Sequence, residues 1–371
     1  MILFLTQCFP SRIGGMESLV SNLALSLSRQ KKIIVFADRY NLFFDAIFDN
    51  HHKEEILVRR IGGLKFFRRR KKIKEVKHFI ETGNVKLIIA DSWKSLELGV
   101  DYFAKKNIPL ICLAHGNEIL SNNQNKRKRI KKTLDLVNTI VANSNFTEKL
   151  LQEQINPKAD LVTIYPGALD ITNIDQKEIS SIKGSPTLLT LARLEKRKGH
   201  LEIINTVNKL LSKFPNLQYI IAGSGPELKN LKKIVKEKKL EKNVILLGNV
   251  DESQKKFLFQ KADLMIMTTL DETHNRSIEG FGISYLEASF FSIPSIASNV
   301  GGTPEAVINN VTGKIINNMD ELYSTVHDLL LDENMIKKLG SNAKKRAFNE
   351  FTWDHISKKY LLLINSLTKI N

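Results

Sequence analysis

Two carboxylates flank a glycine-rich turn, with Glu279 before it and Glu287 eight residues later. Glycines at positions 280 and 282 leave backbone N–H groups open where a helix is expected to begin, and a helix start binds anions. Glu287 then falls early in that helix, where it can hydrogen-bond ribose hydroxyls, and Glu279 precedes the helix, where it can contact a sugar. We therefore predict a site for a nucleotide-linked sugar. The predicted binding residues of the turn itself are Phe281, Gly282 and Ile283.

Cations that could bind a diphosphate follow an earlier apolar run, residues 188–191. We place Arg193 at the end of that predicted strand and Lys198 at the start of the next helix. A bidentate guanidinium and a compact ammonium in these positions can converge on one diphosphate. They would bind most tightly as negative charge develops on a departing nucleotide, which makes them candidate catalytic groups together with Glu279. A basic surface loop in a basic protein is the alternative interpretation.

A histidine and several glycines supply the remaining candidates. His115 follows the apolar run 109–114, so it can donate to a sugar hydroxyl or lend its backbone carbonyl to a developing positive charge; a solvated or structural histidine is the alternative. Gly14 and Gly15 precede a helical pattern and let the backbone approach a bound group closely, although a plain strand-to-helix turn would use the same residues. Gly225 lies in Gly-Ser-Gly-Pro, which resembles a nucleotide loop without the full dinucleotide fingerprint.

The elements that would position these residues alternate along the chain as short apolar runs and helical patterns, which predicts βαβ units around parallel sheets. The first series of predicted strands covers residues 2–5, 33–37, 85–90, 109–114, 139–142 and 161–164. A polar stretch at 170–185 is typical of a linker. The second series covers residues 188–191, 219–222, 244–247, 264–267 and 295–297. Three helices are expected from about Met319 onwards.

The economical architecture is α/β: two Rossmann-like, doubly wound parallel-sheet domains that face a cleft, with ligands at the carboxyl ends of the strands. A length of 371 residues also exceeds what one hydrophobic core usually spans. The glycine pair at 301–302 is interpreted as mostly structural, with Thr303 capping a helix that begins at Pro304.

Composition narrows the class of protein. The two cysteines, Cys8 and Cys112, lie in separate apolar runs and form neither a metal motif nor a disulfide framework. They are expected to be small buried side chains in a reducing compartment. No segment resembles a signal peptide, and none approaches the ~20 apolar residues that cross a bilayer. We therefore expect a cytoplasmic protein.

The net charge of +17 is concentrated in two basic clusters. The first basic cluster, residues 68–74, follows Phe66 and Phe67, and the second covers residues 126–132. Basic clusters suit anionic lipid head groups, at roughly 1 kcal/mol for each basic residue near such a surface. Solvated helix faces and nucleic-acid phosphates are the alternatives. We predict an anionic membrane surface and no nucleic acid as partner, which places the protein peripherally on the inner face of a membrane.

Together these segments resemble glycosyltransferase family 4, retaining enzymes of the GT-B type that are also called group 1 glycosyltransferases. The resemblance covers essentially the whole chain and rests on Gly14-Gly15-Met16-Glu17, His115-Gly116, Asn143-Ser144, Arg193 with Lys198-Gly199, Gly223-Ser224-Gly225-Pro226, the E-x7-E pattern from Glu279 to Glu287, and Gly301-Gly302. It implies an acceptor domain at 1–169 and a donor domain at 170–351. It also implies that a final helix, about 352–371, packs back on the acceptor domain.

The resemblance implies that Arg193 and Lys198 bind the diphosphate, that Glu287 binds the ribose and Glu279 the donor sugar, and that His115 lies beside sugar and acceptor. It also implies domain closure and retention of anomeric configuration, with the leaving phosphate accepting the acceptor's proton and with no metal or cofactor. The polar loop before Glu279 looks most like that of mannosyltransferases, so the donor is expected to be GDP-mannose, or else a UDP-hexose.

The expected function is transfer of a hexose, with mannose as the first candidate, to a growing cell-surface glycan or lipid-linked acceptor, such as a lipopolysaccharide or exopolysaccharide intermediate. One alternative is another GT-B enzyme, a sugar-phosphate synthase or a nucleotide-sugar epimerase. The other is a non-catalytic module that binds nucleotide sugars or nucleic acid.

Overall fold

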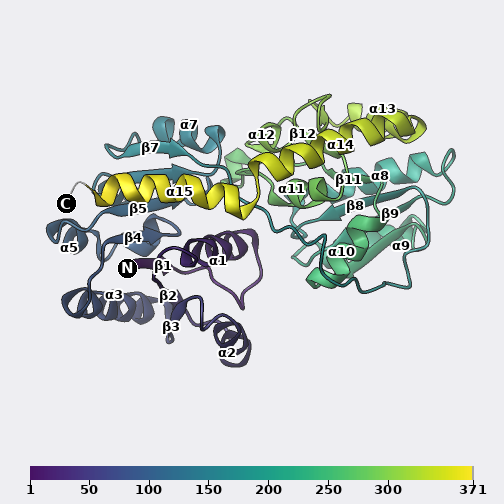
Figure 1. Ribbon diagram of the computed structural model, residues 1–371. Helices are drawn as coiled ribbons and strands as arrows, with labels where there is room; N and C mark the ends of the chain where they lie inside the picture. The colour runs from purple at the N-terminus through teal and green to yellow at the C-terminus, as the bar shows by residue number, and fades with distance from the viewer. Residues whose placement is uncertain (370–371) are drawn as a thin grey trace. The chain divides into compact units, whose positions relative to one another are not determined.

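The computed structural model describes residues 1–369 and divides the chain into two α/β units (Figure 1). Unit 1 comprises residues 1–167 and the segment that starts at Trp353, and unit 2 comprises residues 168–352. The final helix, α15 (Trp353–Thr368), therefore belongs to the first unit although unit 2 precedes it in the sequence. The last two residues of the predicted final helix, 370 and 371, lie outside the described residues.

Within residues 1–369, unit 1 is built on a seven-stranded parallel sheet in the order β3-β2-β1-β4-β5-β6-β7. Its strands are β1 (Ile2–Thr6), β2 (Ile33–Asp38), β3 (Leu57–Ile61), β4 (Leu87–Ala90), β5 (Leu110–Ala114), β6 (Thr139–Ala142) and β7 (Asp160–Thr163). The central strands are buried along their whole length, as parallel strands covered on both faces should be. The strand order reverses between β1 and β4, so ligands are expected beyond the carboxyl ends of these strands.

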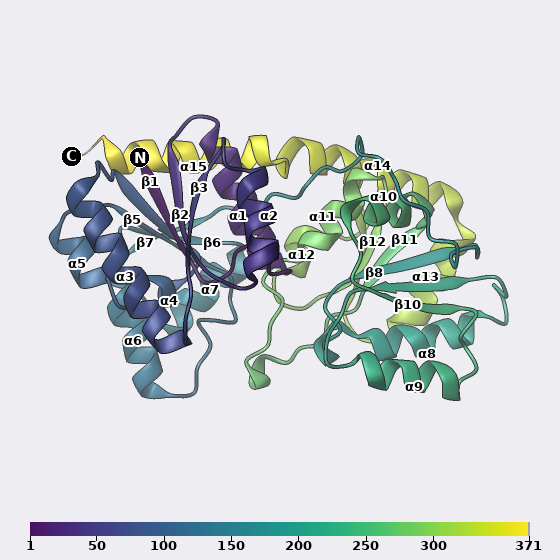
Figure 2. The same ribbon diagram turned by 90° about the horizontal axis from the view of Figure 1, so that it is seen from below.

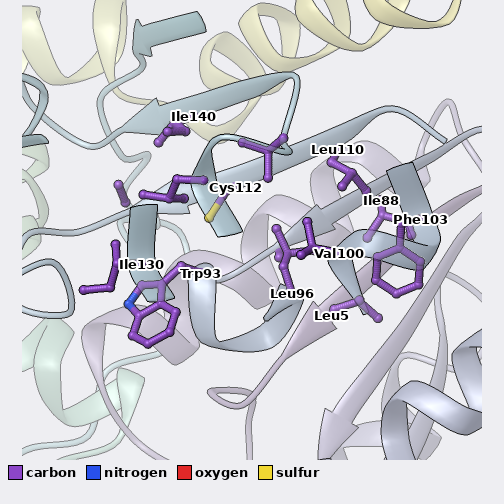
Figure 3. Packing of buried hydrophobic residues seen from close by; sticks show 14 of the residues in the cluster. Leu5, Ile88, Trp93, Leu96, Val100, Phe103, Leu110, Cys112, Ile130 and Ile140 are labelled. Atoms are coloured by element: carbon purple, nitrogen blue, oxygen red, sulfur yellow. The ribbon is translucent and has the colours of Figure 1, made fainter. Parts of the chain in front are cut away.

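Helices cover both faces of this sheet (Figure 2). Those of unit 1 are α1 (Gly15–Ser28), α2 (Leu42–His51), α3 (Lys65–Thr82), α4 (Trp93–Leu96), α5 (Val100–Lys105), α6 (Gln124–Leu134), α7 (Asn145–Gln154) and α15. Helices α3 to α7 contribute to one apolar core, in which Cys112 of β5 lies among Trp93, Ile130 and Ile140 (Figure 3). Helix α1 packs against α15. Both cysteines are buried free thiols, which confirms the prediction that they are small buried side chains.

Unit 2 contains, in the described part of the chain, a six-stranded parallel sheet in the order β10-β9-β8-β11-β12-β13. Its strands are β8 (Thr187–Leu191), β9 (Gln218–Ala222), β10 (Val244–Gly248), β11 (Leu264–Met267), β12 (Ser295–Ser298) and β13 (Gly313–Ile316). Its helices are α8 (His200–Leu210), α9 (Leu228–Glu237), α10 (Glu252–Lys261), α11 (Ile283–Phe290), α12 (Thr303–Ala306), α13 (Glu321–Leu331) and α14 (Glu333–Glu350). The order reverses between β8 and β11, which marks the ligand edge of this sheet.

The predicted α/β class with two parallel-sheet domains is confirmed. Each predicted apolar run overlaps a strand, and the three expected C-terminal helices are α13, α14 and α15. One local prediction is wrong by a residue: α12 begins at Thr303, and Gly302 occupies the capping position. The Thr303 hydroxyl instead donates to the carbonyl oxygens of Ser298 and Val300. None of the helices found within residues 1–369 offers a continuous apolar stretch of the length that a bilayer span needs.

Candidate active site

The strongest candidate site lies at the carboxyl end of β8, in unit 2. The strand leads into a short loop and a single 3-10 turn, Lys196–Lys198, before α8 begins at His200. The loop is held by the loop after β9, because the N–H of Leu194 donates to the carbonyl of Ser224 at 3.0 Å. A Cβ added to Gly225 would lie 2.4 Å from the Leu194 carbonyl oxygen. Gly225 therefore permits close packing of the two loops, and its contact with a donor stays a prediction.

A network of charged side chains occupies this edge of the sheet. The ammonium of Lys198 and the guanidinium of Arg197 both contact the carboxylate of Glu279, with Arg197 Nη1 2.6 Å from Glu279 Oε2. Arg197 also contacts Glu195 at 3.2 Å, and Glu195 contacts Arg193 at 2.9 Å. The predicted residues Arg193, Lys198 and Glu279 are thus connected, through two residues that the sequence pattern does not predict. The contacts run from Arg193 through Glu195, Arg197 and Glu279 to Lys198, and the convergence of Arg193 and Lys198 on one diphosphate stays a prediction.

Burial divides this charge network into an inner and an outer part. The side chains of Lys198 and Glu279 are 9% and 12% exposed, whereas that of Arg193 is 66% exposed. Burial lowers the pKa of Lys198, and the Glu279 charge offsets this only in part. Burial alone would raise the pKa of Glu279, but Lys198 and Arg197 hold it below its ordinary value. The fold therefore holds a carboxylate and two basic side chains largely out of water, which is costly and typical of functional sites.

The backbone of Glu279 is supported by the glycine pair at 301–302. The N–H of Gly302 donates to the Glu279 carbonyl oxygen at 2.9 Å. Gly301 has a left-handed φ of 62°, and a Cβ there would lie 2.3 Å from the same carbonyl oxygen. This pair, interpreted from the sequence as structural, holds a predicted catalytic residue in place.

The glycine-rich turn after Glu279 begins a helix as predicted, with Gly282 in the capping position and Ile283 as the first residue of α11. Phe281 differs from the prediction. Its side chain is buried and packs edge-to-face on Phe351, with ring centroids 6.0 Å apart. The side chain belongs to the core, so the prediction that Phe281 contacts a donor can hold for its backbone alone.

Glu287 lies one turn into α11 and forms an ion pair with a lysine outside the charge network. Its carboxylate is 3.4 Å from Lys255 Nζ on α10, and Lys255 also contacts Glu252 at 2.9 Å. Burial raises the pKa of Glu287, and Lys255 lowers it by a smaller amount. The sequence pattern does not predict Lys255 as a site residue. The sequence does contain a usable pattern: Asp251 and Gln254 form a capping box, which fixes where α10 begins. The start of the helix in turn fixes the helix face on which Lys255 lies.

In unit 1, His115 follows β5, and its Nε2 lies 2.9 Å from the carbonyl oxygen of Asp91. A carbonyl only accepts, so Nε2 carries the proton, and Nδ1 of the neutral ring is an acceptor. In this tautomer Nδ1 can accept from a sugar hydroxyl, and the contact of His115 with sugar and acceptor stays a prediction. Asp91, a residue that the sequence pattern does not predict, is buried and accepts from the Thr6 hydroxyl and the Gln7 N–H at 2.8 Å. It ties the ends of β1 and β4 together beside His115.

Gly14 and Gly15 form the start of α1, with Gly15 as its first residue. Glu17 lies in the first turn, as predicted, where it is buried and pairs with Arg12 at 2.9 Å. Gly14 lies against this carboxylate, because a Cβ on Gly14 would approach Glu17 Oε2 to 2.2 Å. These glycines and His115 belong to unit 1, whereas the charge network and Glu287 belong to unit 2. A donor contact from Gly14 or Gly15 stays a prediction.

The two basic clusters are less exposed to solvent than the sequence predicts. Lys72 of the first basic cluster is buried and pairs with Asp38. Arg69 of the first cluster and Arg129 of the second both pair with Glu97, at 2.8 and 2.5 Å. Carboxylates from distant parts of the sequence therefore neutralise several charges of both clusters, and their contact with a membrane surface stays a prediction.

Comparison with known proteins identifies the family. The family model described as Glycosyltransferase Family 4 matches residues 13–168, and the family model described as Glycosyl transferases group 1 matches residues 172–346. A GDP-mannose-dependent alpha-(1-6)-phosphatidylinositol monomannoside mannosyltransferase from Mycobacterium tuberculosis is 26% identical over 263 residues, covering 67% of this chain and 68% of that protein. A GDP-mannose-dependent monoacylated alpha-(1-6)-phosphatidylinositol monomannoside mannosyltransferase from Corynebacterium glutamicum is 23% identical, covering 98% and 97%.

Comparison with solved structures shows the same type of fold. A crystal structure of HepE from Anabaena in complex with UDP and glucose superposes with a TM-score of 0.80 at 22% identity, covering 98% of this chain and 99% of that one. The two family matches together span both α/β units. This chain is a hexosyltransferase that belongs to the group 1 glycosyltransferases, with the two parallel-sheet domains of the GT-B class.

Proposed function

We propose that unit 2 binds a nucleotide diphosphate-sugar at the charge network, and that unit 1 binds the acceptor. The observation that carries this proposal is the buried Lys198–Glu279–Arg197 cluster at the ligand edge of the sheet, connected to the exposed Arg193. Lys198 and Arg193 bind the diphosphate, Glu279 binds the donor sugar, and Glu287 accepts hydrogen bonds from the ribose hydroxyls.

The chemistry follows from where charge develops. As the bond between sugar and diphosphate breaks, the leaving group gains negative charge, which fixed cations stabilise without having to reorganise. The Glu279 carboxylate offsets part of the effect by which burial lowers the pKa of Lys198. We propose that transfer retains the anomeric configuration and needs no metal, with a leaving phosphate oxygen accepting the proton of the acceptor hydroxyl. No side chain is therefore assigned as nucleophile.

GDP-mannose is the donor that we propose first. Both mannosyltransferases described above are GDP-mannose-dependent by name. The polar loop before Glu279, residues 271–277, also resembles the corresponding loop of mannosyltransferases. A UDP-hexose is the second candidate.

A thermal-shift panel of GDP, UDP, ADP and CMP, run in EDTA, tests the donor site. We expect one diphosphate, GDP first, to stabilise the wild type, by about 2.7 kcal/mol at a hundred times its Kd. Arg193→Ala should lose most of this stabilisation. Lys196→Ala, an exposed lysine of the same 3-10 turn, should keep it and serves as the matched control. Stabilisation by none of the nucleotides would contradict the donor site, and stabilisation only after Mg²⁺ is added would contradict the metal-free mechanism.

We further propose that the acceptor is a lipid-linked glycan at an anionic membrane face. Apolar side chains are unusually exposed on α2 and at the start of α3; Phe43 and Phe66, for example, are 68% and 61% exposed. We call this set of individually exposed side chains, drawn from both helices, the α2–α3 apolar surface. Its members are Leu42, Phe43, Phe44, Ile47, Leu64, Phe66 and Phe67. The guanidinium of Arg70 lies 3.6 Å from the centroid of the Phe66 ring, so cationic and apolar groups are mixed, as at a membrane interface.

Co-sedimentation with vesicles tests membrane binding. The wild type is expected to bind phosphatidylcholine vesicles containing 30% phosphatidylglycerol more tightly than pure phosphatidylcholine. Phe43→Ser with Phe44→Ser should weaken that binding at least about tenfold, because each exposed ring buries apolar area in the interface. Leu331→Ser with Leu362→Ser, equally exposed apolar positions elsewhere, should leave it unchanged. Equal binding by all three proteins would exclude the α2–α3 apolar surface as the contact.

A further inference from the structure

A cavity of about 180 Å³ lies in unit 1 at the carboxyl ends of β1 and β2, beside the start of α3. Its lining residues are Gln7, Phe9, Arg12, Asp38, Arg39, Tyr40, Lys65 and Arg68. This is the edge of the sheet at which ligands bind in doubly wound folds. The volume suits a group of several non-hydrogen atoms, such as a phosphate with its substituent, and exceeds the space of a single water.

The lining of this cavity is strongly cationic. Among the described residues, it contains four cationic side chains and one carboxylate. Arg12 is neutralised by Glu17, and Asp38 is shared between Arg68 at 2.9 Å and the buried Lys72. Asp38 is the single carboxylate among the described lining residues and already contacts these two basic side chains, so it does not neutralise the other cations of the lining.

Two cations at the mouth of the cavity add to this excess. Arg39 and Lys65 are exposed, and within residues 1–369 no carboxylate lies within ion-pair distance of either one. Arg39 lies over Gly62, where a Cβ would be 3.3 Å from its guanidinium, so the chain leaves room for this side chain. The amide nitrogen of Gln7 is buried and has no hydrogen-bond acceptor in the described part of the chain. Buried donors without acceptors are rare, and a ligand oxygen would satisfy this one.

We propose that this cavity binds a phosphate group carried by the acceptor. The identification of the ligand as the acceptor rests on the function proposed above; the anion site itself rests on the cavity and its charges. Arg39 and Lys65 hold the phosphate oxygens at the mouth, and the Gln7 amide donates from within. Charge-assisted hydrogen bonds of this kind are the strong ones in phosphate recognition.

The position of the cavity identifies the source of the phosphate. Tyr40 and Lys65 line it, and each is next or nearly next in sequence to a member of the α2–α3 apolar surface, Leu42 and Leu64. A phosphate bound here therefore lies beside exposed apolar side chains. This arrangement fits a phospholipid or another lipid phosphate, whose apolar part covers that surface, better than it fits a free sugar phosphate.

Calorimetric titration with short-chain lipids below their micelle concentration tests the site. The probes are dihexanoyl phosphatidic acid, dihexanoylglycerol, which lacks the phosphate, and inorganic phosphate. The wild type is expected to bind the phosphatidic acid at least about tenfold more tightly than either other probe. The double variant Arg39→Gln with Lys65→Gln should lose at least about tenfold in that affinity. Lys86→Gln with Lys105→Gln removes the same charge from exposed positions of unit 1 and should bind as the wild type does.

The outcomes separate the parts of the proposal. Equal affinity of the Arg39/Lys65 variant and the wild type for phosphatidic acid overturns the anion site. Inorganic phosphate binding as tightly as phosphatidic acid overturns the lipid source and leaves a soluble phosphate as the ligand. Stabilisation by the nucleoside diphosphate, measured on the same samples, reports the donor site independently. If the nucleoside diphosphate stabilises neither the wild type nor either double variant, while the wild type still binds phosphatidic acid, the proposed function is overturned and the anion site is not.

Discussion

A Lys198→Met enzyme is expected to turn over about 10²- to 10³-fold more slowly than the wild type at saturating donor. Methionine keeps an unbranched apolar stem in the buried position, so loss of the positive charge is the main change. Glu279 retains Arg197 at 2.6 Å, and its charge is not left unpaired. Removal of one fixed group that stabilises transition-state charge typically costs 10²–10³ in kcat. Nucleoside diphosphate released from the sugar donor, with a lipid extract or water as acceptor, measures the effect.

Two further variants separate the charge of Lys198 from its packing. Lys196→Met changes the exposed lysine of the same turn and should keep kcat within about twofold of the wild type. Lys198→Arg retains the charge with a different shape, so it should recover part of the lost activity. If Lys198→Met keeps more than a tenth of the wild-type kcat with an unchanged unfolding temperature, the ammonium does not stabilise the leaving group.

The strands that the sequence does not predict are those that lack a continuous apolar run, the pattern from which strands are predicted. Strands covered on both faces are continuous apolar runs, and all of those are predictable from the sequence. The two strands that are not predicted, β3 and β13, are edge strands without a continuous apolar run, whereas the edge strands β7 and β10 retain such a run and are predicted. The β3 segment, Leu57–Ile61, alternates exposed and half-buried positions and includes two arginines, so it has no apolar run. The β13 segment begins with glycine and lysine, residues that disfavour a strand prediction.

In the site, too, the sequence predicts which residues take part but not which residues contact one another. Spacing after a predicted strand is enough to select Lys198 and Glu279, but it does not show that one neutralises the other across 81 residues of sequence. It also cannot tell which cation of the Lys196–Lys198 turn faces inward; the 3-10 geometry buries Lys198 and leaves Lys196 exposed. For the same reason the sequence does not show that Lys72 of the first basic cluster is buried against Asp38.

A Gly301→Ala enzyme is expected to lose about 10²-fold in kcat/KM without contacting any substrate itself. The added Cβ would lie 2.3 Å from the Glu279 carbonyl oxygen, which is backbone and has no flexible side chain to yield. Relief of that contact moves Glu279 away from Lys198 and Arg197. A displacement of about 1 Å at a catalytic group can cost 10²-fold in rate. Steady-state kinetics with the donor selected by the nucleotide panel measures the loss.

Gly248→Ala is the matched control for backbone strain. Gly248 also has a positive φ, 76°, but a Cβ there meets nothing within 4 Å. Both alanines must adopt a left-handed conformation, so both variants should lose roughly 1 kcal/mol of unfolding free energy from strain alone. A 10²-fold loss confined to Gly301→Ala ties activity to the position of Glu279. Similar losses in both variants would mean that general destabilisation of unit 2, and not the support of Glu279 by the glycine pair, limits catalysis.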